Sequence, residues 1–466
     1  MLTPADFERR LHVISALAFA FFFVVLAALA WWQVLDTGLA NQDRNPRILA
    51  RFYDTNRGRI LDRDGNVIVE TLPDGRRYLH EASLAHVVGY LDPRYGSQGV
   101  ELAYEAVLSG RSASGWSGAL RHEFLREPVR GDDVRLTIDP AVQAAAREAL
   151  GSRKGAVVAL DPGTGEILAM VSVPTFDPGA LGTVGEELLA DPSAPLLNRA
   201  TQGLYPPGST FKTVTALGAL EAGIVAADTP VDCPGEIIID GFPISCRNTP
   251  QGVGKYPFSH AFTYSVNAVF AQIGVQLGWR RLDDIATRLG FGRSIDFPLQ
   301  TAPSQLTSPG APRTTVLLAS TAFGQGQLLA TPLQMALVAA MVANRGEIPA
   351  PRIALDALRD GHAVQTLSSP SRRRVVDAST AETVAAMMQS VVAAGQATGV
   401  TIPGVTVAGK TGTAEAGDGT SHAWFIAFAP VESPRVAVAV IVESGGQGGT
   451  VAAPIAGRII RAAVSP

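Results

Sequence analysis

The chain has 466 residues, a formal net charge of -4, 47% apolar residues and 17% charged residues. This composition is typical of a globular protein with sizeable cores, and it excludes a disordered or fibrous chain. The nearly neutral charge provides no basic patch, so we expect no nucleic-acid partner. The length is sufficient for about three domains.

The first element is an apolar segment from Val13 to Leu35 that contains no charged residue. Its length predicts a transmembrane helix. Arg9 and Arg10 precede the segment. We therefore expect residues 1–12 to form a cytoplasmic tail and everything after the segment to lie on the far side of the membrane.

The end of this segment leaves one alternative open. Trp31 and Trp32 fit an aromatic anchor at the membrane interface. Ala28-Leu29-Ala30 resembles the cleavage site of a signal peptide, but the apolar core is longer than is usual for one. We favour an uncleaved anchor.

Residues 36–138 are expected to form a small non-catalytic domain. A strand, an Asp64-Gly65 turn and a second strand predict a hairpin between residues 55 and 68. No catalytic constellation is found before Asp139. This domain is therefore expected to serve spacing and partner contact.

A larger domain, residues 139–466, is predicted to begin with a helix that Asp139 caps and Pro140 starts. The segments 155–160 and 166–171 predict an antiparallel strand pair joined by a turn. Thr331, Pro332 and Gln334 predict a helix with a reciprocal capping box.

The C-terminal part returns to a strand pattern. Three strands and a closing helix are predicted at 405–410, 423–429, 436–442 and 455–463. Strands at both ends of the domain, with helices between them, predict an α+β fold in which helices flank one antiparallel sheet.

Two cysteines, Cys233 and Cys246, lie on the predicted outer side, where a disulfide is permitted. Pro234, Gly235 and Gly241 between them favour a bridge across a hairpin. A metal site would require further ligands nearby, so no metal is expected. Two free thiols remain the alternative.

Three short motifs stand in order: Ser209-Thr210-Phe211-Lys212, Ser265-Val266-Asn267 and Lys410-Thr411-Gly412-Thr413. Gly208 permits a tight approach into a helix, so Ser209 is predicted at a helix N-terminus with Lys212 on the same face. A serine nucleophile needs an adjacent base. Lys212 can be that base if burial and the nearby charge of Lys410 lower its pKa.

The other two motifs supply polar groups. Ser265 and Asn267 flank one residue, so their side chains can share a cavity while Val266 faces the core. Lys410 is predicted at the end of a strand, where Gly412 would let the substrate backbone lie close. The threonine hydroxyls and Lys410 can bind a terminal carboxylate. No zinc, Walker or dinucleotide motif accompanies the set, so no cofactor is expected.

The ordered set resembles the S-x-x-K, S-x-N and K-T-G pattern of the penicillin-recognising serine enzymes. The flanking residues Tyr205-Pro206-Pro207-Gly208 and Ala268-Val269-Phe270-Ala271 are similar too. The stretch from Arg57 to Asn66 resembles the start of the pedestal of class B penicillin-binding proteins. Tyr78-Leu79 departs from the Tyr-Pro step often seen there.

This resemblance implies a single-pass protein of the bacterial plasma membrane. Its outward-facing β-lactamase/transpeptidase-like domain would cross-link peptidoglycan stem peptides ending in D-Ala-D-Ala and bind β-lactams covalently. It implies catalytic roles for Ser209, Lys212, Ser265, Asn267 and Lys410, and substrate binding by Thr411, Gly412 and Thr413. In particular, Ser265 would pass a proton to the leaving amine, Asn267 would donate to the substrate amide, and the backbone N–H groups of Ser209 and Thr413 would form the oxyanion hole.

Three alternatives remain: a D,D-carboxypeptidase, a class D-like β-lactamase and a β-lactam-sensing membrane receptor. Class D enzymes carry S-x-V at the second motif, whereas this chain has Asn267. The predicted tail is too short for a signalling domain. No stretch resembles a glycosyltransferase domain, so a polytopic glycosyltransferase of the shape, elongation, division and sporulation (SEDS) family is the implied partner.

Overall fold

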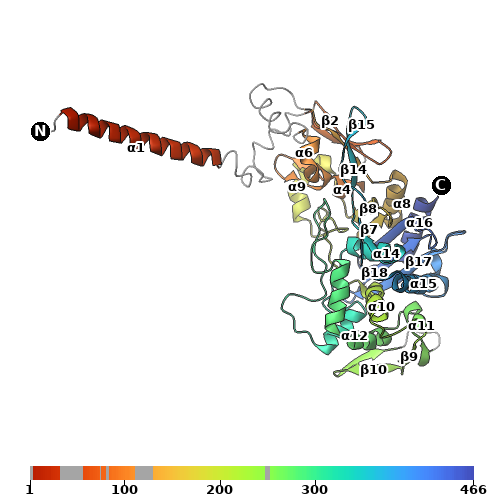
Figure 1. The fold of residues 1–466 in the computed structure, drawn as a ribbon. Helices are drawn as coiled ribbons and strands as arrows, with labels where there is room; N and C mark the ends of the chain where they lie inside the picture. Colours follow the sequence, from red (N-terminus) through yellow and green to blue (C-terminus); the bar gives the residue numbers. More distant parts are fainter. Residues whose placement is uncertain are drawn as a thin grey trace.

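A computed structural model describes residues 4–31, 56–73, 75–79, 83–110, 130–246 and 252–465. The N-terminal helix α1 (Pro4–Ala30) stands apart from the rest of the described chain (Figure 1). Its part from Glu8 to Ala30 is apolar and long enough to cross a membrane. The predicted membrane segment, Val13 to Leu35, lies within this helix as far as the end of the helix at Ala30. Residues 32–35 of the segment lie outside the described part.

The larger sheet has five antiparallel strands in the order β17-β18-β19-β7-β8. Strands β7 and β19 pair along their whole length, which joins the two ends of the domain as predicted. The bounds are β7 Gly155–Leu160, β8 Ile167–Val173, β17 Ala408–Glu415, β18 Ser421–Ala429 and β19 Val436–Val442. The α+β fold is confirmed.

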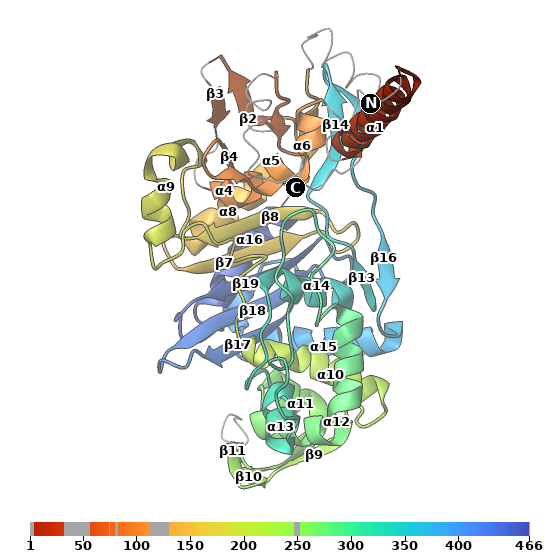
Figure 2. The same cartoon turned by 90° about the vertical axis from the view of Figure 1, so that its left-hand side faces the viewer.

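Helices cover both faces of this sheet (Figure 2). Helix α14 (Pro332–Ala343) contacts β18, β19 and β7 on one face, beside α15 (Ala378–Ala394) and α10 (Lys212–Glu221). Helices α8 (Pro140–Leu150) and α16 (Ala452–Val464) pack together on the other. Every residue of α14 is buried, which explains why its sequence is apolar apart from Gln334.

The helix caps are largely as predicted. The Asp139 side chain accepts hydrogen bonds from the first turn of α8, and the Thr331 hydroxyl accepts one from the N–H of Gln334. The reciprocal bond predicted for Gln334 was wrong, because its amide donates to the Leu289 carbonyl at 2.8 Å. The N–H of Thr331 instead donates to Ser304 Oγ. The Gln334 side chain is oriented toward a carbonyl at the end of a distant helix, and the N–H that its Oε1 was predicted to bond has another acceptor.

The second sheet has six strands, none longer than six residues, in the order β15-β14-β6-β1-β2-β3. Four of them come from the N-terminal region, and β1 and β2 form the predicted hairpin. The bounds are β1 Ile60–Leu61, β2 Val67–Leu72, β3 Gly75–Tyr78, β6 Asp133–Leu136, β14 Ala354–Arg359 and β15 His362–Thr366. The predicted division at residue 139 did not include the last two strands, which cross over from the C-terminal region.

A buried ion network lies beside this sheet. Glu101, on the short helix α5 (Gly99–Ala103), accepts from Arg57 at 2.8 Å and from Arg76 at 2.7 Å. All three side chains are at most 5% exposed. The smaller elements around the network are α4 Ala85–Val88, β4 Leu91–Asp92, β5 Gly96–Ser97 and α6 Glu105–Leu108.

The remaining elements lie around the larger sheet. Helices α11 (Phe258–Thr263), α12 (Asn267–Leu289) and α13 (Thr315–Ala322) pack near two small sheets, one formed by β9 and β12 and the other by the β10–β11 hairpin. The bounds of the others are α9 Leu181–Ala190, β9 Pro230–Cys233, β10 Glu236–Ile239, β11 Phe242–Ser245, β12 Gly254–Pro257, β13 Glu347–Pro349 and β16 Arg372–Arg374.

Candidate active site

Ser209 lies in a short 3-10 turn, Gly208–Phe211, that leads directly into α10. Gly208 has φ +55° and lies so close to β17 that a Cβ there would be 2.8 Å from the carbonyl oxygen of Thr413. A residue with a side chain would be strained at this φ and would also clash. The glycine therefore lets the serine turn sit directly against the strand that carries the third motif.

Lys212 follows one turn later, and its amine is fully buried. Its Nζ lies 3.0 Å from Ser209 Oγ. It donates to the Ser265 carbonyl oxygen and to Asn267 Oδ1, each at 2.6 Å, and lies 3.1 Å from Ser265 Oγ. The structure thus brings the first two motifs together around one amine.

These contacts fit a neutral amine. A neutral lysine has two N–H groups and one lone pair, whereas a charged one has three donors and no acceptor. The carbonyl of Ser265 and the amide oxygen of Asn267 only accept, and they are the two closest partners. The lone pair is then left for a hydroxyl, which is what deprotonation of Ser209 requires.

The second motif lies in a strained connection between α11 and α12. Ser265 has φ +61°, a conformation that residues with a Cβ rarely adopt. In this conformation both its carbonyl oxygen and its hydroxyl contact Lys212. Val266 is fully buried, and Asn267 begins α12. Strain of this kind is often concentrated at functional sites.

Lys410 completes the cluster from β17. Its Nζ lies 3.0 Å from Ser265 Oγ and donates to the Thr411 carbonyl at 3.1 Å. The Ser265 hydroxyl therefore lies between two buried amines, 3.1 Å from Lys212 and 3.0 Å from Lys410. A hydroxyl that both donates and accepts can pass a proton from one amine to the other.

The two lysines perturb each other because they are buried together. Burial, followed by the charge of Lys410, lowers the pKa of Lys212 well below its ordinary value. Burial lowers the pKa of Lys410 to about 7. Among the residues that the structure describes, neither lysine forms an ion pair with a carboxylate that would restore its charge. Both directions favour an amine that can act as a base.

The strand that carries the third motif is longer than predicted. It was predicted to end at Lys410, but β17 continues to Glu415 by pairing with β18. Gly412 is also required by packing inside the protein, because a Cβ there would lie 2.8 Å from the Pro207 carbonyl and 3.0 Å from Thr210 Cγ2. Its predicted role in making room for the substrate backbone stays a prediction.

The threonines of this motif contact a neighbouring segment. Thr411 Oγ1 donates to Gln396 Oε1 at 3.2 Å, and Thr413 Oγ1 accepts from the N–H of Gly448 at 3.4 Å. Thr411 is almost fully buried, while Thr413 is exposed. Strand β17 lies at the edge of the sheet, so its outer edge is not paired with another strand of that sheet.

Tyr205 and Glu443 support the serine turn and were missed in the sequence. The Tyr205 hydroxyl donates to Glu443 Oε1 at 2.8 Å, and its ring packs edge-on against Trp424. Glu443 also accepts from Arg199 at 2.8 Å and from Lys154 at 3.1 Å. The tyrosine lies four residues before Ser209, but no local pattern indicates its distant carboxylate partner.

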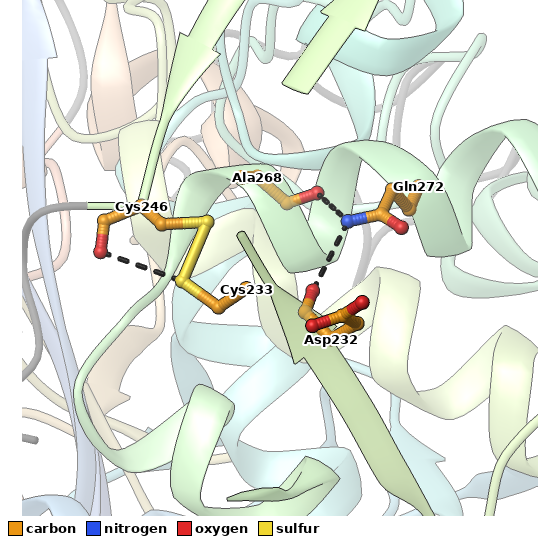
Figure 3. The surroundings of a disulfide bond; sticks show 5 residues. All are labelled: Asp232, Cys233, Cys246, Ala268 and Gln272. Atoms are coloured by element: carbon orange, nitrogen blue, oxygen red, sulfur yellow. Dashed lines mark hydrogen bonds between the residues drawn. A yellow bond between two sulfur atoms is a disulfide. The ribbon is translucent and has the colours of Figure 1, made fainter. Parts of the chain in front are cut away.

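Cys233 and Cys246 form a disulfide bond at the base of the β10–β11 hairpin, with Cα atoms 5.8 Å apart (Figure 3). On the neighbouring helix α12, the Gln272 amide donates to the carbonyls of Asp232 and Ala268 at 3.3 Å. The disulfide region is thereby connected to the first turns of the helix that begins with the second motif.

In the described part of the chain, no group of three or more His, Cys, Asp or Glu side chains could hold a metal ion. Trp424 is fully buried and His422 is half-buried, where its Nδ1 accepts from the N–H of Ser444. Trp424 pairs across the sheet with Gly412 of the third motif, and His422 pairs with Ala414, just beyond that motif.

The chain matches two protein families. Residues 155–461 match the penicillin binding protein transpeptidase domain, and residues 57–134 match the penicillin binding protein A dimerisation domain. A curated relative, the peptidoglycan D,D-transpeptidase PbpA of Mycolicibacterium smegmatis, is 36% identical over an alignment of 461 residues. The match covers 92% of this chain and 93% of the relative.

Solved structures agree with these matches. The imipenem acyl-enzyme complex of penicillin-binding protein A from Mycobacterium tuberculosis has a TM-score of 0.82 at 34% identity, and the match covers 90% of this chain and all of that one. Penicillin-binding protein 2 of Pseudomonas aeruginosa has a TM-score of 0.75 at 32% identity, covering 88% of this chain and 95% of that one.

Proposed function

We infer that this chain, which belongs to the penicillin-binding protein transpeptidase family, is a peptidoglycan D,D-transpeptidase that works through a serine acyl-enzyme. One observation carries the site assignment: the buried Nζ of Lys212 lies 3.0 Å from Ser209 Oγ and donates to two groups that only accept. The arrangement orients a lone pair toward the serine.

In the proposed acylation step, Ser209 Oγ attacks the carbonyl carbon between the last two D-Ala residues, and its proton passes to Lys212. Ser265, between the two amines, delivers a proton to the departing D-Ala nitrogen. The C–N bond breaks, D-Ala leaves as a free amine, and the donor peptide remains as an ester of the serine. An acceptor amine from a second stem peptide then displaces the serine to form the cross-link.

Two groups of residues bind the substrate in this proposal. The oxygen of the Asn267 amide is occupied by Lys212, so its N–H groups are available to a substrate amide. The N–H groups of Ser209 and Thr413 form the oxyanion hole, where each donor is worth about 3 kcal/mol in the transition state. Strand β17, with Thr411 and Gly412, provides an edge for an extended peptide.

A β-lactam follows the same first step, in which the ring C–N bond breaks and the amine stays attached. We expect fluorescent penicillin to label the full-length chain at Ser209 and Ser209→Ala to abolish this labelling. Thr210→Ser, on the adjacent residue of the same turn, is the matched control and should be labelled normally. Mass spectrometry that finds the adduct on a different residue would refute the assignment.

Transpeptidation is distinguished from hydrolysis by the fate of the acyl-enzyme. A thioester analogue of the stem peptide, incubated with the full-length chain and a D-amino acid, should yield mostly the exchanged peptide. Dominant hydrolysis would favour a D,D-carboxypeptidase, and rapid release of hydrolysed penicillin would favour a class D-like β-lactamase. Stable acylation without either peptide product would favour a β-lactam receptor.

We further propose that α1 anchors the catalytic domain outside the cytoplasm. Within its 23 residues from Glu8 to Ala30, an 18-residue window has a mean hydropathy of 2.8, and the arginines at positions 9 and 10 lie near the N-terminal end. An externally added protease should digest the domain in spheroplasts but leave an N-terminal epitope intact. Protection of the domain would contradict this orientation.

The partner proposed for this enzyme is a polytopic SEDS-family glycosyltransferase, because the chain has no glycan-polymerising domain of its own in either family match. Cross-linking needs nascent glycan strands, and another protein must supply them. Co-purification of such a polymerase with the full-length chain, but not with a chain whose residues 36–138 are exchanged, would support the pedestal as the contact.

A further inference from the structure

A cavity of about 430 Å³ lies between the C-terminal end of α12, helix α14 and the small sheet formed by β13 and β16. Figure 2 shows these elements grouped beside α14. Asn267 of the catalytic site begins α12, whereas Leu289 at the cavity ends it. The cavity is therefore separate from the site already described.

The lining combines a cationic and hydroxylic rim with an apolar floor. Arg293, Arg372 and Arg373 supply guanidinium groups, and Ser294 and Ser371 supply hydroxyls. Arg372 has a carboxylate partner, Glu347, at 3.9 Å. The floor includes the buried side chains of Leu289, Leu337 and Ile348. Asp296 is the acidic residue in the lining.

Arg293 and Arg373 differ from their neighbours in their lack of counter-charges. Nearby Arg288 pairs with Glu221, and Arg374 pairs with Glu347 at 2.8 Å. Within the described ranges, neither Arg293 nor Arg373 forms an ion pair with a carboxylate, Asp296 included. The cavity therefore holds two guanidinium groups that no protein carboxylate neutralises.

These like charges are held near one another. Arg373 Nη2 donates to the carbonyl oxygen of Arg288 at 2.7 Å, which fixes the guanidinium at the end of α12. Burial, followed by the charges of Arg293 and Arg288, lowers the pKa of Arg373. A guanidinium remains charged in proteins, so the repulsion persists until an anion enters.

We propose that this cavity binds a phosphate ester, with Arg293 and Arg373 on the phosphate oxygens and the organic part against the floor. Guanidinium groups present paired donors that match phosphate geometry, and the hydroxyls of Ser294 and Ser371 add two further donors. A soluble phosphate ester and a lipid phosphate share this chemistry.

The test is calorimetric titration of the full-length chain in a neutral detergent. Glycerol 1-phosphate and dihexanoyl phosphatidic acid are the two ligands, and succinate is the carboxylate comparison. We expect saturable binding of at least one phosphate ester, and Arg293→Glu should weaken it by at least about tenfold. Binding of both esters indicates a soluble source, and binding of the phosphatidic acid alone indicates a lipid source.

Arg435→Glu is the matched control, because Arg435 is also exposed but contacts the Val464 carbonyl instead of this cavity. Labelling by fluorescent penicillin should persist in both variants and shows that they are folded. The proposal is overturned if no phosphate ester binds saturably, if succinate binds as tightly, or if Arg435→Glu weakens binding equally.

Discussion

Buried cations occur in both the pedestal and the catalytic site, but their partners differ. In the pedestal, Arg57 and Arg76 share the buried carboxylate of Glu101. Burial raises the pKa of Glu101, but the charges of the two arginines and their hydrogen bonds outweigh it and leave that pKa below its ordinary value. The network therefore stays ionised.

In the catalytic site, Lys212 and Lys410 are equally buried but are surrounded by hydroxyl and carbonyl oxygens. Without a carboxylate, the desolvation of a charged amine is not offset, and loss of the proton becomes favourable. Similar burial therefore accompanies an ionised network in one place and lowered lysine pKa values in the other, and the latter is the reason for proposing Lys212 as a neutral base.

The largest effect that the comparison predicts comes from restoring a permanent charge. Lys212→Arg keeps the position and the cation, but a guanidinium cannot accept the proton of Ser209. The rate of acylation by fluorescent penicillin should fall about 10²–10⁴-fold, the usual contribution of a general base. Lys154→Arg, at a partly exposed lysine that pairs with Glu443, should leave the rate nearly unchanged. A near-normal rate in Lys212→Arg would mean that another base operates.

The next effect should appear in stability rather than in chemistry. Glu101→Gln leaves two buried guanidinium groups without their carboxylate, which should reduce the free energy of unfolding by about 3–5 kcal/mol. Glu382→Gln, at an exposed pair with Arg345, should change it by less than about 1 kcal/mol. Thermal or urea unfolding measures both. Equal losses would show that burial does not distinguish the two pairs.

Local sequence patterns were sufficient to predict much of the fold. The Asp139 cap, the strand pair of β7 and β8, and the C-terminal strands follow from residues that are close in sequence. The addition of β14 and β15 to the pedestal sheet does not, because β14 pairs with β6 more than two hundred residues away, with Ala357 opposite Val134. The register of such a long-range strand pair depends on the surface that the folded domain presents, and the sequence of one strand does not specify it.

In the candidate site, too, local features could be predicted from the sequence and long-range features could not. Spacing predicted that Ser209 and Lys212 share a face and that Ser265 and Asn267 share a cavity. It could not show that Ser265 adopts a positive φ to contact Lys212 with two oxygens, since serine seldom adopts that conformation. Nor could the sequence pattern place Lys410 inside a strand, because the polar residues of the third motif interrupt the alternation of apolar and polar residues that indicates one. The pairing of Lys410 with Ile426 shows that Lys410 lies within the strand.

The most direct test of the central claim is the pH dependence of acylation at Ser209, measured with a β-lactam whose own charge does not change over the range. In the proposed mechanism the neutral form of Lys212 is the base, so the rate should rise with pH as the coupled lysine pair loses a proton. Because burial lowers both pKa values, with that of Lys410 at about 7, we predict a plateau well below pH 10. A rate that rises only as an ordinary lysine titrates, near its unperturbed value of about 10.4, would contradict the account.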